Sequence, residues 1–443
     1  MPGMPTPRES LAALAGTCLL LALLAGALFA GSEWGRPAAP PGGAAGERPA
    51  ARLDADELAR LGRERAPEVA PRGERLRGLR FDAVPEAQLS DTEALRAVLE
   101  EQLARPAAQR RLALADVELR LLGLLEPGQS VGELAADTSG ATAAYYDPRT
   151  DELFLLADAV PASRGVAEFV LAHELTHALE DQRFGLEDPG VRADDGELAR
   201  TALIEGSATA LMMRYATRHL DPGDLALDAG AIDPGTEDMP RFLLSQLLFA
   251  YFGGQRFVES LLELSPDWKV VDHAYRSRPP VSTEQIIHPE KYLAGERPLP
   301  APRPGRPGPG WRKADEETIG EFATRENLRI ALGFAASRRA AAGWGGDRYV
   351  LWRRAGAGPG ADAHADHALA LAWRWDTRAD ALEFAGAARA WLTAGLDGTP
   401  EGAGTWRLPQ GWAALSAHGD EVLVALAPTR AEAERMTHRN VQP

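Results

Sequence analysis

The amino-acid sequence predicts a protein of the α+β class, with a mainly helical first part that contains one small β-hairpin or sheet, and a separate α+β domain at the C-terminus. Three observations lead to this prediction. Apolar residues recur at helical spacing through much of residues 91–264, β-compatible runs flank a turn within 141–156, and helical and strand-like segments alternate after residue 311. The hydrophobic content of 45% and the charged content of 25% are typical of a globular protein.

The composition divides the 443 residues into five segments. Proline and glycine are so frequent in 298–311 that neither a helix nor a sheet can continue through it, so we expect a linker there. The expected segments are an N-terminal signal or anchor (1–30), a tether rich in proline, glycine and alanine (31–75), a first folded domain (76–297), the linker (298–311) and the C-terminal α+β domain (312–443).

Apolar spacing and turn residues also predict the individual elements. Before the linker we expect helices at 91–103, 112–125, 165–184, 196–219 and 239–264, and a hairpin within 141–156. After it we expect helices at 319–341 and 378–394, strands at 348–352, 369–375, 412–416 and 421–427, and a short terminal helix. Ser90 is the expected cap of the first helix, Gly185 the expected stop of the third, and Gly253-Gly254 the expected break in the fifth.

The segment from Leu11 to Ala30 is apolar and uncharged, and its 20 residues match the length of a membrane-spanning helix. Three interpretations stay open: an uncleaved membrane anchor, a signal peptide cleaved near Ala27 or Ala30, and a lipoprotein signal around Cys18. Each of them places the rest of the chain outside the cytoplasm. We therefore expect an exported protein, either anchored to the membrane on its extracytoplasmic side through this segment or secreted.

The charge and the cysteine count exclude several classes of partner and cofactor. A formal net charge of -16 argues against nucleic-acid binding, because no basic field is available to neutralise phosphates. Cys18 is the single cysteine, so the folded domains have no disulfide and no thiolate metal ligand. Any bound metal ion must be held by nitrogen and oxygen atoms.

Two histidines in the predicted helix at 165–184 have the spacing of metal ligands. His173 and His177 are four residues apart, so both imidazoles lie on one face of the helix, one turn apart, and can reach one ion. Glu174 is rotated away from that face, where it can contact a water on the metal without binding the metal itself. The motif predicts one Zn²⁺ ion with Glu174 as general base.

The sequence around the motif makes a chance occurrence improbable. A His-Glu-x-x-His pattern is expected by chance in roughly one or two chains in a hundred of this length. Apolar residues flank the pair, and no proline or glycine occurs between Val166 and Phe184, so the helix should be largely buried. Two buried imidazoles beside a carboxylate need a partner such as a metal ion. The alternative is a pair of histidines that only form hydrogen bonds in a core.

A catalytic zinc site needs a third protein ligand and one open position. Glu205, on the next predicted helix, is the best candidate, because it is a lone acid in an apolar stretch where an unpaired charge would be costly. The alternative is that Glu205 faces the solvent. Asp194, Asp195 and Glu197 are rival ligands, although they lie in a polar run that resembles a solvated helix start.

Three pieces of the sequence carry a family resemblance: His-Glu-Leu-Thr-His-Ala-Leu-Glu-Asp-Gln at 173–182, Glu-Gly-Ser-Ala-Thr at 205–209 and Ser-Thr-Glu-Gln-Ile-Ile-His-Pro-Glu-Lys-Tyr at 282–292. The region resembles the gluzincin branch of the zincin metallopeptidases and is similar to a largely uncharacterised group of bacterial and archaeal putative metallopeptidases. The resemblance implies a zincin-like domain over 76–297, zinc on His173, His177 and Glu205, and hydrolysis of protein or peptide substrates. The setting of Glu205 differs from that in thermolysin-like enzymes.

The resemblance also suggests roles for two further segments. In zincins an edge strand above the motif helix pairs with an extended substrate, and 152–156 would be that strand; the alternative is an ordinary core hairpin. Gluzincins use a His or Tyr outside the zinc motif to stabilise the oxyanion, which makes His288 and Tyr292 candidate catalytic residues. Local sequence gives this segment a structural role as well, because Ser282 and Gln285 can cap a short helix that ends before Pro289.

A second function of a different class stays open. The chain could be a zinc-stabilised binding or scaffold protein of the cell envelope that has no peptidase turnover, although a purely structural site has no use for Glu174. His364 and His367, in the run Ala-His-Ala-Asp-His-Ala, are expected in a polar loop or turn rather than at a metal.

Overall fold

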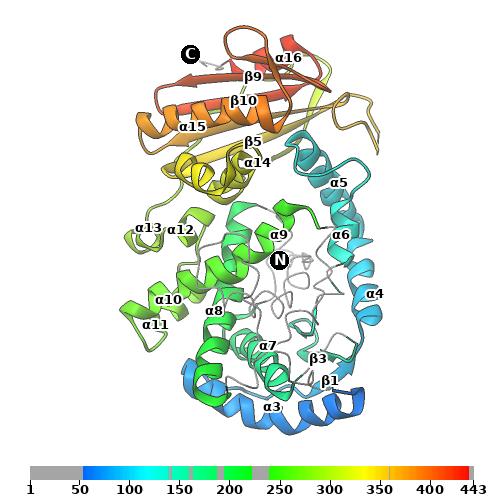
Figure 1. Ribbon diagram of the computed structural model, residues 1–443, viewed down its shortest axis with the longest axis vertical. Helices are drawn as coiled ribbons and strands as arrows, with labels where there is room; N and C mark the ends of the chain where they lie inside the picture. The colour runs from blue at the N-terminus through cyan, green and yellow to red at the C-terminus, as the bar shows by residue number, and fades with distance from the viewer. Residues whose placement is uncertain are drawn as a thin grey trace, which may run out of the picture.

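The computed structural model describes residues 53–137, 139, 142–158, 163–186, 194–221, 239–358 and 360–438. Two parts lie one above the other along the longest axis of the molecule (Figure 1). We call the part within residues 53–297 the helical unit and the part within residues 311–438 the sheet unit. The mixed α/β class expected from the sequence is confirmed, with a seven-stranded antiparallel sheet in the C-terminal region.

The helical unit contains one small sheet among many helices. Its elements are α3 (Ala55–Arg77), β1 (Ala87–Ser90), α4 (Thr92–Leu103), α5 (Pro106–Leu121), α6 (Val131–Asp137), β2 (Ala144–Asp147), β3 (Glu152–Leu156), α7 (Arg164–Phe184), α8 (Asp195–His219), α9 (Arg241–Leu248), η3 (Phe249–Gly253), α10 (Gly254–Leu264), α11 (Lys269–Arg276), α12 (Thr283–Ile287) and α13 (Pro289–Ala294).

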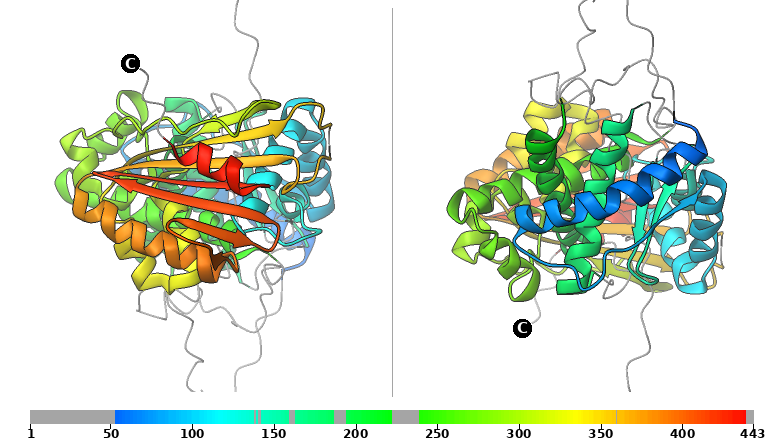
Figure 2. Two further views of the ribbon diagram at one scale, coloured as in Figure 1. Left: turned by 90° about the horizontal axis from the view of Figure 1, so that it is seen from above. Right: turned by 90° about the horizontal axis from the view of Figure 1, so that it is seen from below.

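Helix α8 lies between two hydrophobic cores. On one side, residues such as Met212 and Tyr215 pack with α7, α3 and β3. On the other side, residues such as Leu203 and Leu211 pack with α10 and α11. Helix α3 crosses the end of the molecule that is farthest from the sheet unit and covers α7 (Figures 1 and 2). Both α7 and α8 are therefore enclosed by other elements, and their facing side chains are shielded from solvent.

The small sheet has the strand order β1-β3-β2. Strands β2 and β3 are antiparallel, as the predicted hairpin requires, and β1 adds to β3 in parallel. The prediction that 152–156 forms an edge strand is therefore wrong: β3 is the central strand, with both of its edges paired. Strand β2 is the edge strand that contacts α7.

The predicted break at Gly253-Gly254 is also wrong. Residues 241–264 form a continuous run of α9, one π-helical turn (η3) and α10, and Gly253 and Gly254 have helical dihedral angles. The glycine at 254 serves a packing role instead. A Cβ atom placed on Gly206 of α8 would lie 2.1 Å from the carbonyl carbon of Gly254, so the two helices cross with their backbones in contact.

The sheet unit has the strand order β4-β5-β6-β10-β9-β8-β7. Its elements are β4 (Trp311–Glu317), α14 (Gly320–Ala341), β5 (Trp344–Arg354), β6 (His367–Trp375), α15 (Arg378–Ala390), η4 (Trp391–Gly395), β7 (Thr399–Pro400), β8 (Thr405–Leu408), β9 (Gly411–His418), β10 (Glu421–Ala427) and α16 (Arg430–Thr437). Helices α14 and α15 cover one face of the sheet and α16 covers the other (Figure 2).

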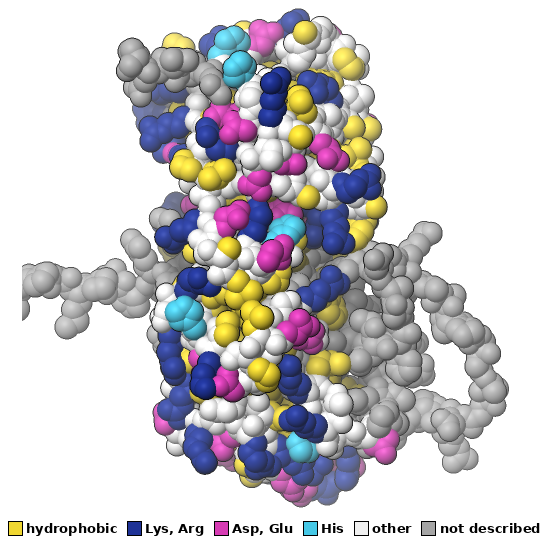
Figure 3. Space-filling view, turned by 90° about the vertical axis from the view of Figure 1, so that its left-hand side faces the viewer, with side chains coloured by type: hydrophobic (Ala, Val, Ile, Leu, Met, Phe, Trp, Pro, Cys, Tyr) yellow, Lys and Arg dark blue, Asp and Glu magenta, His cyan; other side chains and the backbone are white. Residues whose placement is uncertain are grey.

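The two units share part of a core. Val117 and Leu121 of α5, together with Leu122, belong to the same buried cluster as Trp344 and Trp373 of the sheet unit. The predicted boundary between domains 76–297 and 312–443 therefore cuts across one set of packed side chains. Mixed basic and acidic side chains cover the face that carries α10 to α13, and hydrophobic side chains gather there near mid-height, where the two units meet (Figure 3).

The predicted linker has no regular secondary structure through residue 310, as expected, but it is fixed to the sheet unit. The N–H of Leu299 donates to the carbonyl of Gly345 at 2.6 Å, and that of Gly305 donates to the carbonyl of Met436 at 2.9 Å. The segment is therefore attached to the sheet unit rather than acting as a free spacer.

Other sequence predictions need correction at the N-terminal side. The tether predicted for 31–75 is wrong from residue 55 onward, because Ala55–Arg77 is helical in spite of Pro67 and Pro71 inside it. The cap of α4 is Asp91, whose carboxylate accepts from Ala94 N at 2.7 Å, and not Ser90, which ends β1. The stop at Gly185 is confirmed.

The prediction of a transmembrane helix also requires correction. Within the described residues no helix combines the length and the apolar character needed to cross a membrane. The segment from Leu11 to Ala30, on which that prediction rested, lies outside the described residues. We therefore withdraw the transmembrane helix as a feature of the structure.

The crossing of α8 and α10 gives a stability prediction. Gly206→Ala would force a methyl group into the backbone of Gly254, and we expect it to lower the free energy of unfolding by about 1–3 kcal/mol or more. Gly73→Ala is the matched control: Gly73 lies within α3, and no heavy atom lies within 4 Å of a Cβ built there, so this change should raise stability by about 0.5–1 kcal/mol. Denaturant unfolding measures both; equal stability of Gly206→Ala and the parent would contradict the close crossing.

Candidate metal centre

Helix α7 places the two histidines of the motif. The Ser163 hydroxyl caps its start by accepting from Val166 N at 3.2 Å. No glycine or proline interrupts the turn that carries His173 and His177, so the residues stay one helical turn apart on one face. Their Nε2 atoms lie 2.9 Å from each other, and the side chains are buried, with relative exposures of 1% and 5%.

Helix α8 brings a carboxylate to the same point. The Oε2 atom of Glu205 lies 3.3 Å from His173 Nε2 and 3.5 Å from His177 Nε2. Glu205 is 5% exposed, and the ligand-type atoms of the three residues all lie within 4.8 Å of one another. We call these three residues the His-Glu cluster. The predicted burial of Glu205 is confirmed, and the interpretation of Glu205 as a solvent-facing residue is wrong.

Burial and charge act in opposite directions on the His-Glu cluster. Burial lowers the pKa of His173 to about 4. Burial also disfavours the charged form of His177, but the Glu205 carboxylate outweighs it and raises the pKa of His177 to about 9. For Glu205, burial favours the neutral acid, while the His177 charge is the main cause that lowers its pKa to about 2. Without a metal ion, the cluster thus holds a buried ion pair between His177 and Glu205.

Glu174 lies beside the His-Glu cluster but is not part of it. Its side chain is fully buried, and its Oε2 atom accepts a hydrogen bond from the backbone N–H of Tyr146 at 3.0 Å. Tyr146 belongs to the edge strand β2. The carboxylate is therefore held between the motif helix and the edge strand, rotated away from the two imidazole nitrogens as the helical spacing predicts.

A buried network fixes the backbone around the His-Glu cluster. Glu180 lies one turn after His177 and accepts hydrogen bonds from Arg77 Nε at 2.5 Å, from Ser207 Oγ at 2.6 Å and from Tyr275 OH at 2.8 Å. These bonds join α3, α7, α8 and α11 through a single carboxylate. Sequence reasoning missed this network, because Glu180 and Arg77 are 103 positions apart and nothing local links them.

Tyr251 is a second residue near the cluster that sequence reasoning missed. It lies on η3, is 1% exposed, and its ring centre is 5.9 Å from that of His173. In the sequence it is one aromatic residue in an apolar run, a pattern that gives no sign of a functional site.

The structure gives His288 and Tyr292 partners outside the His-Glu cluster. His288 Nε2 lies 3.1 Å from the Glu321 carboxylate, and the Tyr292 hydroxyl donates to the carbonyl of Arg278 at 2.8 Å. Helix α12, which precedes them, meets α8 at Asp195, ten positions before Glu205, or about 15 Å along the helix. Their role as oxyanion donors stays a prediction. The structural interpretation of the segment is confirmed, with Ser282 capping α12.

The three acids considered as alternative metal ligands lie outside the His-Glu cluster. Asp194 caps α8 by accepting from Glu197 N, and Asp195 accepts from the N–H of Thr283 at 3.0 Å. The carboxylates of Asp194, Asp195 and Glu197 are absent from the His-Glu cluster among the residues that the structure describes. Of the two later histidines, His364 lies in a turn, as expected, but for His367 the expectation is wrong: it opens strand β6 and is buried, and its Nδ1 lies 3.1 Å from the carbonyl of Asp362.

The donor set fits a zinc ion in most respects. Two imidazole nitrogens and one carboxylate oxygen, converging from two enclosed helices, match a three-ligand zinc site with one open position. One feature departs from the usual pattern: His173 Nδ1 is buried and has no hydrogen-bond partner among the described residues, whereas metal-bound imidazoles usually donate this N–H to a carboxylate or carbonyl.

Comparisons with known proteins bear on the sheet unit. Residues 309–437 match the family model of a domain of unknown function, DUF8575. No curated protein and no solved structure matches the chain. The matched region does not contain the His-Glu cluster, so the function of the cluster has to be argued from its own geometry.

The ligand assignment predicts the metal content of three variants. His177→Ala and Glu205→Ala should each reduce bound zinc well below the roughly one ion per chain expected for the parent protein, because each removes one of three ligands. His288→Ala is the control and should keep the zinc of the parent, since His288 pairs with Glu321 instead. Metal analysis by mass spectrometry after dialysis measures this. Full zinc occupancy in Glu205→Ala would show that another residue is the third ligand.

The pKa values also predict how zinc binding depends on pH. At pH 7 the metal-free site carries a proton on His177, whose pKa is about 9, while His173 and Glu205, with pKa values of about 4 and 2, carry none. Zinc takes the neutral imidazole, so binding at pH 7 should release about one proton and weaken as the pH falls. Calorimetry in two buffers of different ionisation enthalpy counts the protons; no release at pH 7 would contradict the ion pair.

Proposed function

We propose that the chain is a zinc-dependent peptidase with a zincin-like helical unit, in which His173, His177 and Glu205 bind one zinc ion. The observation that carries the proposal is the convergence of the two Nε2 atoms and one carboxylate oxygen within 4.8 Å, in a buried place that also holds Glu174. A purely structural metal site has no need for Glu174, a second carboxylate that is not among the proposed ligands. The arrangement of motif helix, ligand helix and adjoining edge strand supports the zincin-like description.

The chemistry follows from the three ligands and Glu174. A zinc ion bound there would supply Lewis acidity, which polarises a peptide carbonyl and lowers the pKa of water. Glu174 accepts the proton as water attacks the carbonyl and returns it to the leaving amine. The N–H of Tyr146 keeps this carboxylate aimed at the site by holding its Oε2 atom.

The edge strand defines where an extended substrate would lie. Strand β2 pairs with β3 along one edge and contacts α7, where its Tyr146 N–H donates to Glu174. A peptide added along β2 would therefore run past Glu174 and the His-Glu cluster, with main-chain hydrogen bonds supplying affinity. This replaces the strand at 152–156 as the proposed substrate-binding edge.

The proposal is tested by Glu174→Gln. This variant keeps the shape of the side chain and is expected to keep its zinc, but it removes the proton acceptor, so kcat should fall by about 10²- to 10⁴-fold. Cleavage of a fluorogenic peptide library by the zinc-loaded protein measures the rate. As a control for the metal, the cleavage rate of the parent protein is measured after zinc is removed with a chelator and again after zinc is restored.

Two outcomes would refute the peptidase proposal. One is that Glu174→Gln cleaves as fast as the parent protein. The other is that the zinc-loaded parent, at one ion per chain, cleaves no member of the library, which would favour the alternative of a zinc-stabilised binding or scaffold protein.

A further inference from the structure

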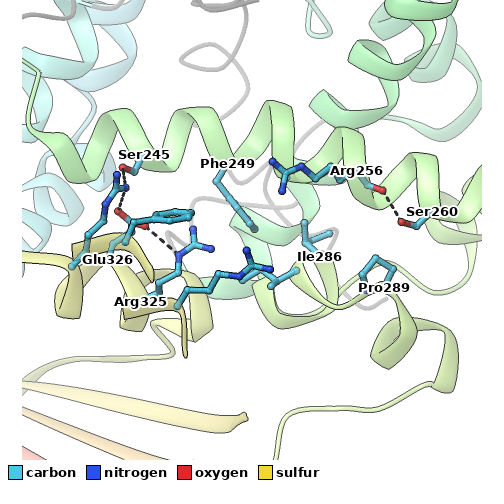
Figure 4. Close-up of a pocket in the computed structure, with 13 residues that line it drawn as sticks. Ser245, Phe249, Arg256, Ser260, Ile286, Pro289, Arg325 and Glu326 are labelled. Atoms are coloured by element: carbon cyan, nitrogen blue, oxygen red, sulfur yellow. Dashed lines mark hydrogen bonds and ion pairs between the residues drawn. The ribbon is translucent and has the colours of Figure 1, made fainter. Parts of the chain in front are cut away.

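A cavity of about 520 Å³ lies where the helical unit meets α14 of the sheet unit. Its walls come from α9, η3 and α10 on one side, from the junction of α12 and α13, and from α14 on the other side (Figure 4). The volume is in the range of small-molecule binding sites, about 300–1,000 Å³. The cavity is separate from the His-Glu cluster and has no residue in common with it.

The cavity is basic although the protein is acidic. Among the described residues, four arginines line it (Arg256, Arg325, Arg329 and Arg338) together with one acid, Glu326, so this lining carries three net positive charges, against a formal net charge of -16 for the whole chain. Arg256 projects from α10 and Arg325 from α14, on opposite sides of the cavity (Figure 4). An anion between the two walls would meet positive charge from both.

Glu326 pairs with two of the four arginines. Its two oxygens lie 3.2 Å from Arg325 Nε and 3.1 Å from an Nη of Arg329. The same Arg329 nitrogen donates to Ser245 Oγ at 3.4 Å, while the buried Nε of Arg329 has no hydrogen-bond partner among the described residues. Burial lowers the pKa of Arg325, which indicates a cation that its neighbours do not fully compensate.

Most of the remaining lining is apolar, which suits the apolar part of a ligand. Phe249 and Ile286 point into the cavity from η3 and α12 (Figure 4). Phe334 lies under two guanidinium groups, with its ring centre 5.1 Å from Arg329 and 6.0 Å from Arg325. It reaches this place because α14 kinks at Gly333, whose φ of 72° is left-handed.

We propose that this cavity binds a small organic anion, with a carboxylate or phosphate group between the arginines of α10 and α14 and a short apolar body against Phe249, Ile286 and Phe334. Guanidinium groups bind both kinds of oxyanion through paired hydrogen bonds, so the two head groups share one chemistry. The proposal does not depend on the function of the His-Glu cluster. A bound ligand would contact both units at once.

Calorimetry on the full-length chain tests the proposal with three probes of equal chain length: octanoate, octyl phosphate and octanol. At least one of the two anions should bind, and neutral octanol should bind at least about tenfold more weakly, because it cannot pair with the guanidinium groups. The comparison of octanoate with octyl phosphate identifies the preferred head group.

Arginine variants test the location of the site. Arg256→Gln combined with Arg338→Gln should weaken anion binding by about tenfold or more; both residues are exposed, so the fold should persist. Arg339→Gln is the matched control, an exposed neighbour of Arg338 that does not line the cavity, and it should leave binding unchanged. If the double variant loses its native circular dichroism spectrum, Arg338→Gln alone takes its place.

Four results would overturn the proposal. These are no binding of either anion, binding of octanol as tight as that of the anions, unchanged affinity in the cavity variants, and an equal loss of affinity in Arg339→Gln. The last result would indicate general attraction to basic residues on the surface rather than a site in the cavity.

Discussion

The close crossing of α8 and α10 at Gly206 and Gly254 is the constraint on which the geometry of the His-Glu cluster depends. Glu205 precedes Gly206, so the contact that fixes the α8 backbone acts within one residue of the carboxylate. Because α10 occupies one side of α8, the adjacent Glu205 side chain is directed toward α7 and its two imidazoles. A side chain at 206 would separate the helices, and the carboxylate would no longer be placed by packing.

Two buried carboxylates in the same part of the molecule are each balanced by a cation. Glu205 is balanced by His177, and Glu180, one turn beyond His177, is balanced by Arg77 of α3. Burying a single carboxylate would cost several kcal/mol in each case, and each pair also fixes the helices that carry it. In the cavity beside α14, Glu326 is shared by Arg325 and Arg329, as Glu168 of α7 is shared by Arg65 and Arg72.

The sequence predicts those parts of the site whose geometry is local. His173, Glu174 and His177 lie on one helix, so their relative directions follow from the helical repeat, and the apolar neighbours of Glu205 indicate its burial. Features that depend on distant pairing could not be predicted. Strand β3 became central because β1, more than 60 residues earlier, pairs with it in parallel, and no local pattern shows that partner.

The helix at 55–77 illustrates a different limit. Its prolines indicated a tether, yet it forms because an Asp54 capping box starts it and Leu58 and Val69 pack into the core with α7. Tertiary burial outweighed the local cost of proline. The arginines around the cavity come from two helices more than 60 residues apart, and only the fold brings them together.

The contribution of α5 to the core of the sheet unit has a consequence for how that unit is defined. The family match begins at residue 309, but Val117, Leu121 and Leu122 complete the hydrophobic cluster around Trp344. A fragment cut at that boundary would expose to water the apolar side chains that pack against these three residues, so the hydrophobic core of the sheet unit extends beyond the sequence that defines the family match.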